Sequence, residues 1–183
     1  MLDMQLVATH TFENAPALDI LIVPGGVGDL TLIEANERSI ENFIISRYHS
    51  TEHILSVCSG AGFLARAGVL DGKRATATKS VWERIIPYGT NVTWIPTARW
   101  VRDGKVWTSS GVTAGMDMMV AFLRDLYGDS NVNDGINGVE YIPHVDAHWD
   151  PFSVIFKVSR YLFLPLATIG ANRYMKPKIA SRR

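Results

Sequence analysis

The amino-acid sequence predicts an α/β fold in which helices cover both faces of a largely parallel sheet. Short apolar segments alternate with amphipathic ones along the chain, as in strands joined by crossover helices. The strand-like segments are apolar, and several of them end at glycine or proline. With 183 residues, 47% of them hydrophobic, the chain is long enough to bury one sizeable core.

In the first part of the chain the alternation is clear. Residues 18–26 form a continuous apolar run that ends in Pro-Gly-Gly, which is typical of a buried parallel strand entering a loop. Residues 31–49 carry apolar side chains at helical spacing. A second short strand is expected at 53–57. A helix is expected at 60–70, closing near Gly68.

The second part adds short strands and a long helix. Strands are expected at 74–78, 91–95, 99–104 and 105–110, and helices at 79–89, 111–128 and 129–142. A turn at Asp103 and Gly104 links the last two strands. The segment 111–128 is strongly amphipathic and ends in glycine, so it is expected to be the main helix of one face.

Charge divides the chain near Pro151. Acidic and basic residues balance at 18 each, but residues 151–183 carry seven basic residues and no acidic one. Residues 1–150 therefore hold eleven basic and eighteen acidic groups, a net charge of about −7. We expect a domain over residues 1–153 and a divergent basic and apolar tail over 154–183, in which the residues after about Ser159 make few contacts with the sheet.

The composition also restricts which classes of partner and which cellular compartment are expected. The balanced charge gives no general attraction to nucleic acid or to an anionic membrane. No stretch reaches the roughly 18 apolar residues of a membrane span. One cysteine cannot form an internal disulfide, and the N-terminus lacks a signal-peptide pattern, so a reducing, cytoplasmic location is expected.

The single cysteine, Cys58, falls between the strand at 53–57 and the helix at 60–70. A nucleophile elbow has this architecture, because a sharp strand-to-helix turn raises one side chain above the carboxyl ends of the sheet. Such a turn requires small neighbours, which Ser56 and Gly60 provide. The helix N-terminus favours a thiolate beside it. The alternative is a buried, inert cysteine.

Two glycines extend this candidate site. Gly25 and Gly26 end the neighbouring strand and allow backbone N–H groups to approach a ligand closely. Together with the N–H of Ser59 they are expected to form an oxyanion-type site beside Cys58. The alternative is an ordinary strand-ending turn.

Three separated segments resemble the DJ-1/PfpI (ThiJ/PfpI) family in family order: "DILIVPGG", "SVCSGAGFLARAGVLDGKRATAT" and "KVWTSSGVTAGMDMMVAFL". Within that family they are similar to the isonitrile-hydratase-like branch and its fungal relatives, over residues 7–153. The resemblance implies a flavodoxin-like three-layer sandwich, class I glutamine-amidotransferase-like, usually a homodimer. It also places Cys58 at the family's elbow cysteine, and Gly25, Gly26 and Ser59 around its small-ligand pocket.

Two departures from the family qualify this resemblance. Ser59 stands where the peptidase-like branch has histidine, which argues against a Cys-His protease site. The family domain opens with a strand, a helix and a strand, and an acid from that segment contacts the elbow cysteine. This sequence matches the family only after that segment, so we expect weak or absent isonitrile hydration by the chain as written.

His144 and Asp146 are the other proton-transfer candidates. Their spacing imitates the late His-x-acid motif that completes a Cys-His-acid triad in glutamine amidotransferases. The alternative is a tail motif of the fungal branch without a catalytic role. His49 and His53 are four residues apart but lack the H-E-x-x-H zinc pattern, so a surface role is favoured. No metal or cofactor is expected.

Three functional hypotheses follow. In the first, Cys58 attacks a small electrophilic carbon, with the hydration of an isonitrile to an N-substituted formamide as the concrete reaction. In the second, the protein is not an enzyme, and Cys58 is a redox sensor or the pocket binds a small ligand. The third is an inactive, truncated family member.

Overall fold

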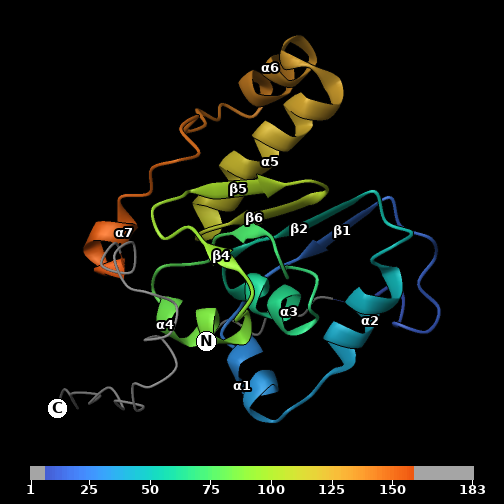
Figure 1. Cartoon of the computed structure of the whole chain (residues 1–183). Coiled ribbons are helices and arrows are strands. Elements are labelled where there is room, and N and C mark those ends of the chain that lie inside the picture. Colours follow the sequence, from blue (N-terminus) through green and yellow to red (C-terminus); the bar gives the residue numbers. More distant parts are fainter. Residues whose placement is uncertain (1–6, 159–183) are drawn as a thin grey trace, which may run out of the picture.

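A computed structural model describes residues 7–158 and contains a central sheet with helices on both of its faces (Figure 1). The elements in chain order are β1 (Ile20–Val23), α1 (Asp29–Glu34), α2 (Ser39–Arg47), β2 (His53–Ser56), the 3₁₀ turn η1 (Cys58–Gly60), α3 (Ala61–Arg66), β3 (Arg74–Ala75), α4 (Trp82–Ile85), the 3₁₀ turn η2 (Ile86–Tyr88), β4 (Thr93–Trp94), β5 (Trp100–Asp103), β6 (Val106–Ser109), α5 (Val112–Tyr127), α6 (Asp129–Gly138) and α7 (Phe152–Ile155). The flavodoxin-like α/β class predicted from sequence is confirmed.

The main sheet has the strand order β1-β2-β6-β5. Strands β1, β2 and β6 are parallel, whereas β5 runs antiparallel to β6 in a hairpin. Gly104 occupies the tight turn of this hairpin at a φ of 61°. Strands β3 and β4 form a separate parallel pair. All three parallel strands of the main sheet therefore direct their carboxyl ends to one edge of the molecule.

One face of the sheet packs against the helices of the first half of the chain. Val23, Ile54 and Val106 lie in a single buried cluster with Phe63 and Leu64 of α3. Ile54 pairs with Val106 in register, so their side chains share this face. Burying a large apolar side chain of this kind contributes about 1.5–3 kcal/mol, so this cluster anchors α3 at the end of β2.

The opposite face packs against α5. Leu55, Trp107 and Trp100 form a buried cluster with Met118 and Phe122 of that helix. Their spacing of four along the helix places Met118 and Phe122 on one side, as the amphipathic pattern of this segment predicts. The two clusters make the sheet the middle layer of a three-layer sandwich.

Several elements differ from their predicted extent. The helix expected over 31–49 is two helices, because the chain turns at residues 35–38, where Asn36 adopts a φ of 53°. The helix expected over 79–89 is the short α4 followed by η2. The strand expected to be buried, β1, lies at the edge of the sheet, and Ile22 is 46% exposed.

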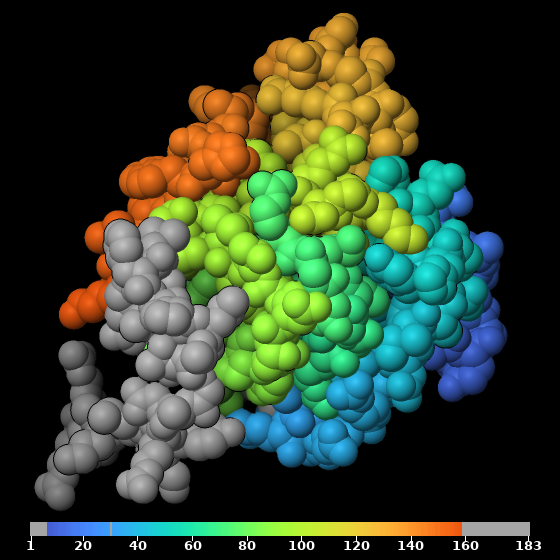
Figure 2. Space-filling model, viewed as in Figure 1, coloured from blue at the N-terminus to red at the C-terminus, as the bar shows by residue number. Residues whose placement is uncertain are grey.

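Helix α6 projects from the body of the molecule (Figure 2), and Val132 is its buried residue. Beyond residue 153, Val154, Ile155 and Phe156 are exposed, whereas Val158 is buried in a cluster with Trp82 and Ile85. The prediction of a loosely packed tail mainly concerns residues 159–183, which lie outside the described residues. Among helices within 7–158, none has both the length and the apolar character to cross a membrane.

Candidate active site

Cys58 occupies the turn between β2 and α3 in the left-handed region of backbone conformation. Val57 is extended, with φ −119° and ψ 137°, and Cys58 then adopts a φ of 63° before the 3₁₀ turn that leads into α3. For a residue with a Cβ atom this conformation costs roughly 1–2 kcal/mol. The turn is therefore strained at the residue that carries the thiol, as in a nucleophile elbow.

Hydrogen bonds from three neighbouring segments hold this strained turn. The Cys58 N–H donates to the Ser110 carbonyl at 2.8 Å, and the Thr78 N–H donates to the Cys58 carbonyl at 3.3 Å. The Val57 N–H donates to the Val23 carbonyl at 3.1 Å. The ends of β1 and β6 and the segment after β3 thus fix the cysteine backbone from different sides.

Gly60 and Gly115 are two of the glycines that the crowding around the turn requires. A Cβ atom on Gly60 would lie 3.0 Å from both the carbonyl carbon and the oxygen of Pro24. A Cβ atom on Gly115 of α5 would lie 2.7 Å from Cγ1 of Val57. The crowding at Gly60 agrees with the small residues that the sequence places around Cys58. The close approach at Gly115 was not predicted, because nothing in the local pattern of α5 indicates it.

Ser59 and Gly25 lie beside the cysteine. The Ser59 hydroxyl donates toward the Cys58 sulfur at 3.9 Å. A Cβ atom on Gly25 would lie 2.5 Å from the Ser59 nitrogen, so the Gly25 backbone packs directly against the elbow. The structure therefore brings Cys58, Ser59 and Gly25 together. Gly26 follows in the same loop, and its N–H donates to Oδ2 of Asp29 at 3.2 Å.

Asp29 is a candidate that sequence reasoning missed. It begins α1 and is only 6% exposed. Its contact with Gly26 places a buried carboxylate in the same loop as Gly25, which packs on Ser59. The sequence offered one signal for it, because Asp29 is the acidic residue that ends "GGVGD" and begins a helix. Such an acid is usually interpreted as a favourable charge in the first helical turn.

The structure places His144 and Asp146 in the segment between α6 and α7. The His144 N–H donates to Oδ1 of Asp117 at 2.9 Å, and its ring stacks on Trp149 with the ring centroids 6.3 Å apart. Asp146 accepts a hydrogen bond from the His148 N–H at 2.9 Å. Within the described part of the chain, no hydrogen bond joins either side chain to Cys58, so the predicted triad gains no support from these contacts.

A buried ion pair nevertheless couples this C-terminal segment to the elbow. Asp117 pairs with the Arg99 guanidinium at 2.6 Å and accepts a hydrogen bond from the Tyr141 hydroxyl. Burial, followed by the hydrogen bond to Asp117, raises the pKa of Tyr141 to about 12, so its hydroxyl stays protonated as a donor. The Arg99 carbonyl accepts from the Ser110 N–H at 2.9 Å, and the Ser110 carbonyl accepts from Cys58.

Lys79 is a second buried charge near the elbow. Lys79 follows Thr78, whose N–H donates to the Cys58 carbonyl, and the Lys79 side chain is fully buried. The ammonium donates to Oγ1 of Thr76 at 2.7 Å and to the Ala98 carbonyl at 2.9 Å, and it lies 3.8 Å from Asp150. Burial lowers the pKa of Lys79 to about 7, although Asp150 favours its charged form.

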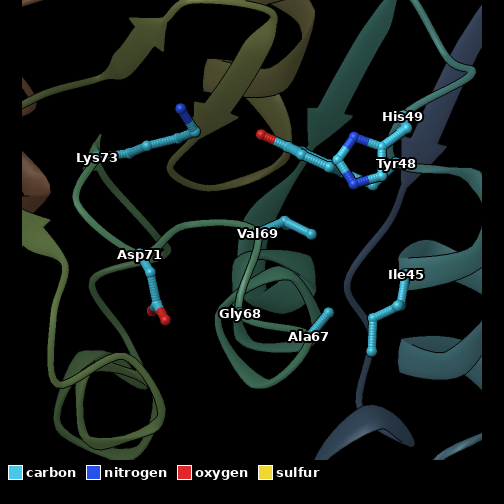
Figure 3. A pocket seen from close by; sticks show the side chains of 8 residues that line it. All are labelled: Ile45, Tyr48, His49, Ala67, Gly68, Val69, Asp71 and Lys73. Atoms are coloured by element: carbon cyan, nitrogen blue, oxygen red, sulfur yellow. The ribbon is translucent and has the colours of Figure 1, made fainter.

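Two surface hollows lie away from this site. One, with a volume of about 260 Å³, has Lys73 across from Tyr48 and His49 and is also lined by Asp71 (Figure 3). Because these residues precede β2 and β3, the hollow lies at the amino ends of the strands, opposite to Cys58. The other hollow is lined in part by Phe12 and Phe43. Open α/β sheets bind ligands at the carboxyl ends of their strands, which favours the elbow as the site.

Between residues 7 and 158, no group of three or more His, Cys, Asp or Glu side chains is arranged to hold a metal ion. His53, one of the two histidines at helical spacing, begins β2, and its ring packs edge-on against Phe122 at 5.1 Å.

Comparison with known proteins identifies relatives of two kinds. Isonitrile hydratase of Pseudomonas putida is 38% identical over 141 residues, which are 76% of this chain and 59% of the hydratase. The HTH-type transcriptional regulator GbdR of Pseudomonas aeruginosa is 32% identical over 132 residues, 68% of this chain and 33% of the regulator. The chain thus spans less than two thirds of each of these curated relatives.

Solved structures agree with this relationship. A THiJ/PfpI family protein from Pseudomonas syringae superposes with a TM-score of 0.66 at 30% identity, covering 86% of this chain and 65% of that protein. Drosophila melanogaster DJ-1beta shares the fold, with a TM-score of 0.56 at 22% identity over 68% of this chain and 64% of its own. The model of the DJ-1/PfpI family matches residues 1–125, more than half of the sequence. The chain therefore belongs to the DJ-1/PfpI family.

Proposed function

We propose that Cys58 is a nucleophile that attacks the carbon of a small electrophile, and that an isonitrile is its substrate. The observation that carries the proposal is the φ of 63° at Cys58, which three hydrogen bonds from separate segments support. Strain of this kind persists where the surrounding structure over-determines it, and it is concentrated at active sites. The 38% identity to an isonitrile hydratase supports the choice of substrate.

The proposed reaction balances without a cofactor. The Cys58 thiolate adds to the terminal carbon of the isonitrile, and that same carbon takes up a proton, which gives an enzyme-bound thioimidate with a carbon–nitrogen double bond. Water then adds to the same carbon. The carbon–sulfur bond breaks, the thiolate is regenerated, and an N-substituted formamide leaves. The net change is the addition of one water molecule to the isonitrile.

Several groups around the sulfur are placed to donate hydrogen bonds or to transfer protons in this reaction. Ser59 donates toward the sulfur and carries a backbone N–H beside it, and Gly25 lies against that N–H. These groups are the proposed donors that steady the intermediate. Gly26, whose N–H is engaged by Asp29, shapes the loop. Asp29 is the proposed proton-handling acid, because it is buried in the loop that contacts Ser59.

Formation of formamide from a simple alkyl isonitrile, followed by proton NMR of the formyl group, tests this proposal. Cys58→Ser is expected to abolish turnover. Asp29→Asn keeps an oxygen acceptor for the Gly26 N–H but cannot exchange a proton, and it is expected to lower the rate about 10²-fold or more. His144→Gln is the matched comparison, because it tests the triad candidate directly. Turnover that persists in the Cys58→Ser variant would contradict the assignment of Cys58 as the nucleophile.

A ligand-sensing role is the second candidate, favoured by the similarity to regulators. Besides GbdR, an AraC family transcriptional regulator from Pseudomonas putida shares the fold, with a TM-score of 0.61 and 23% identity over 75% of this chain and 72% of the regulator. In this role the thiol senses oxidants or contacts a bound small molecule. Peroxide treatment followed by intact mass measurement distinguishes it: a sensor gains one or two oxygen atoms at Cys58 and turns over no isonitrile.

Two further features complete the proposal. We place the protein in the reducing cytoplasm, where the only cysteine of the sequence stays a thiol. We also propose that the chain acts as a homodimer whose small-molecule site lies at the elbow of each copy. Neither nucleic acid nor a membrane is a proposed partner, because acidic and basic residues balance at 18 each.

A further inference from the structure

The buried ion pair of Lys79 and Asp150 lies close to the elbow but takes no part in the proposed reaction. Both side chains are almost completely buried, and Nζ of Lys79 lies 3.8 Å from Oδ2 of Asp150. Burial deprives both charges of water, and their attraction repays this cost only when further hydrogen bonds satisfy them. The hydrogen bonds around the pair show which segments it holds together.

The ammonium of Lys79 joins two segments of the chain. It donates to Oγ1 of Thr76 at 2.7 Å, to the Ala77 carbonyl at 3.0 Å and to the Ala98 carbonyl at 2.9 Å. These three acceptors use all three N–H groups of an ammonium, whereas a neutral amine has only two. The ring of Trp82, whose centroid lies 5.0 Å from Nζ, also favours a cation there. The charged form of Lys79 is therefore the one that this geometry requires.

One of the two segments bonds directly to the cysteine backbone. Thr78 precedes Lys79, and its N–H donates to the Cys58 carbonyl at 3.3 Å. The Thr76 N–H donates to Oγ1 of Thr108 on β6 at 2.9 Å, which fixes the other end of this short segment. The group that holds the Cys58 carbonyl thus lies between two anchored residues, one of which is Lys79.

The other segment leads to the N–H of the cysteine. Ala98, which accepts from the ammonium, precedes Arg99, and the Arg99 carbonyl accepts from the Ser110 N–H at 2.9 Å. The Ser110 carbonyl in turn accepts from the Cys58 N–H at 2.8 Å. Lys79 therefore bonds to both segments through which the N–H and the carbonyl of Cys58 are held.

Asp150 supplies the opposite charge and connects the start of α7 to the same network. Its N–H donates to the Thr97 carbonyl at 2.8 Å, and its Oδ1 accepts from the Phe152 N–H at 3.1 Å. Within residues 7–158 its Oδ2 has no hydrogen-bond partner, so the ammonium 3.8 Å away is the group that compensates its charge. A buried carboxylate without such a cation would be strongly destabilised. The pair therefore acts as one unit.

We propose that Lys79 is a positioning residue for Cys58: its ammonium fixes the segments on both sides of the elbow and so maintains the strained turn that presents the thiol. This inference rests on the proposed function and deepens it, because the reaction requires the sulfur at that turn. Lys79 acts through the backbone groups of Thr78 and Ser110 and not on the substrate. A side chain that only stabilised the fold would leave the turn unchanged in the folded protein.

Steady-state kinetics of isonitrile hydration by the Lys79→Met variant test this role. Methionine keeps a long, unbranched apolar side chain but has no N–H group to donate. We expect kcat to fall about 10²-fold while KM changes little, because a small displacement of the reacting atom lowers the rate of reaction more than binding. A folded variant with an unchanged kcat would overturn the inference.

Arg66→Met is the matched control. Arg66 forms another buried ion pair, with Glu41 at 2.9 Å, and lies at the end of α3 remote from Cys58. This variant is expected to lose stability but to keep its kcat, and circular dichroism checks that both variants are folded. A comparable fall in kcat in the Arg66→Met variant would show a general effect of destabilisation and overturn the inference.

Thermal unfolding of the Cys58→Gly and Cys58→Ala variants, with and without Lys79→Met, gives a second readout that needs no substrate. With Lys79 in place, the glycine variant is expected to unfold at the higher temperature, because glycine adopts a φ of 63° without strain. In the Lys79→Met background this difference is expected to disappear, because the turn is free to relax. A difference of the same size in both backgrounds, or in neither, would overturn the inference.

Asp150→Asn replaces Lys79→Met in both experiments if the methionine variant does not fold. The asparagine oxygen can still accept from the Phe152 N–H, but the lost negative charge disfavours the ammonium of Lys79. Smaller changes in the same directions are expected, and unchanged values would overturn the inference. A wild-type chain without isonitrile turnover would contradict the proposed function, whereas the unfolding comparison would still decide whether Lys79 holds the turn.

Discussion

The carboxyl end of β2 and the outer edge of β1 are neighbouring parts of one sheet with opposite surroundings. At the end of β2, segments from β1, β3 and β6 bond to the backbone around Cys58. At the outer edge of β1, the described chain supplies no strand, and Ile20 and Ile22 are exposed. Both strands are apolar in sequence. Their position in the sheet, and not their composition, distinguishes a strand end held by several hydrogen bonds from a strand at the edge of the described sheet.

The largest expected contrast lies between two side chains paired in register. Leu55 is fully buried and Ile22 is 46% exposed, although both lie on the α5 face. Leu55→Ala is expected to lower the free energy of unfolding by about 3 kcal/mol, because it leaves a cavity between sheet and helix. Ile22→Ala is expected to cost about 1 kcal/mol or less. Urea unfolding at low protein concentration measures both, and equal losses would contradict the edge position of β1.

The next contrast concerns glycines at the elbow and in its loop. Gly60→Ala forces a Cβ atom against the backbone of Val23 and Pro24, so a loss of about 3 kcal/mol in unfolding free energy is expected. Gly26→Ala is the control, since nothing lies within 4 Å of its Cβ position. Its cost is expected to stay within about 0.5 kcal/mol. A tolerated Gly60→Ala would show that the elbow is not crowded.

The elbow side of the sheet also contains a buried lysine, so its stability depends on pH. Because the pKa of Lys79 is lowered to about 7 in the folded chain, the unfolded chain binds the additional proton between about pH 7 and 10.5. Stability contributed by this group therefore rises with pH through that window, by at most about 1.4 kcal/mol per unit. Lys79→Met is expected to remove this rise in the unfolding free energy. An unchanged pH slope in the variant would contradict the burial of a charge there.

The smallest expected effect is the release of strain at the cysteine itself. Cys58→Ala keeps a Cβ atom at a φ of 63°, whereas Cys58→Gly removes it. The glycine variant is therefore expected to be more stable than the alanine variant by up to about 1 kcal/mol. The greater conformational entropy of glycine in the unfolded chain offsets part of this gain. Thermal unfolding of the pair checks the sign. An alanine variant that equals or exceeds the glycine variant would show that the turn is relaxed.

Much of the fold could be predicted from local sequence patterns. Periodicity located β2 and α5, and glycine and proline located most of the ends. The edge position of β1 was not predicted, because a continuous apolar run is the same for a central strand and an uncovered one. The break between α1 and α2 was missed for a similar reason. Apolar residues on both sides of Asn36 keep a helical spacing across the turn.

The candidate site was predicted only in its local part. Cys58, Ser59 and Gly60 are consecutive, so the small-residue pattern was enough to place the turn. The partners that hold the turn are distant in sequence: Ser110 and Thr78 bond to Cys58 through backbone groups, which carry no sequence signal. Asp29 was missed because its role depends on the folding of its loop against Ser59.

The rate at which iodoacetamide alkylates Cys58, measured by intact mass in the native and the urea-unfolded chain at neutral pH, tests the nucleophile most directly. The protein has one cysteine, so every label reports on this thiol. We predict faster alkylation of the native chain, because the strained turn between β2 and α3 raises the sulfur above the carboxyl ends of the strands, in position to attack an electrophile. Slower alkylation of the native chain than of the unfolded one would identify Cys58 as an inert core residue and contradict the proposed function.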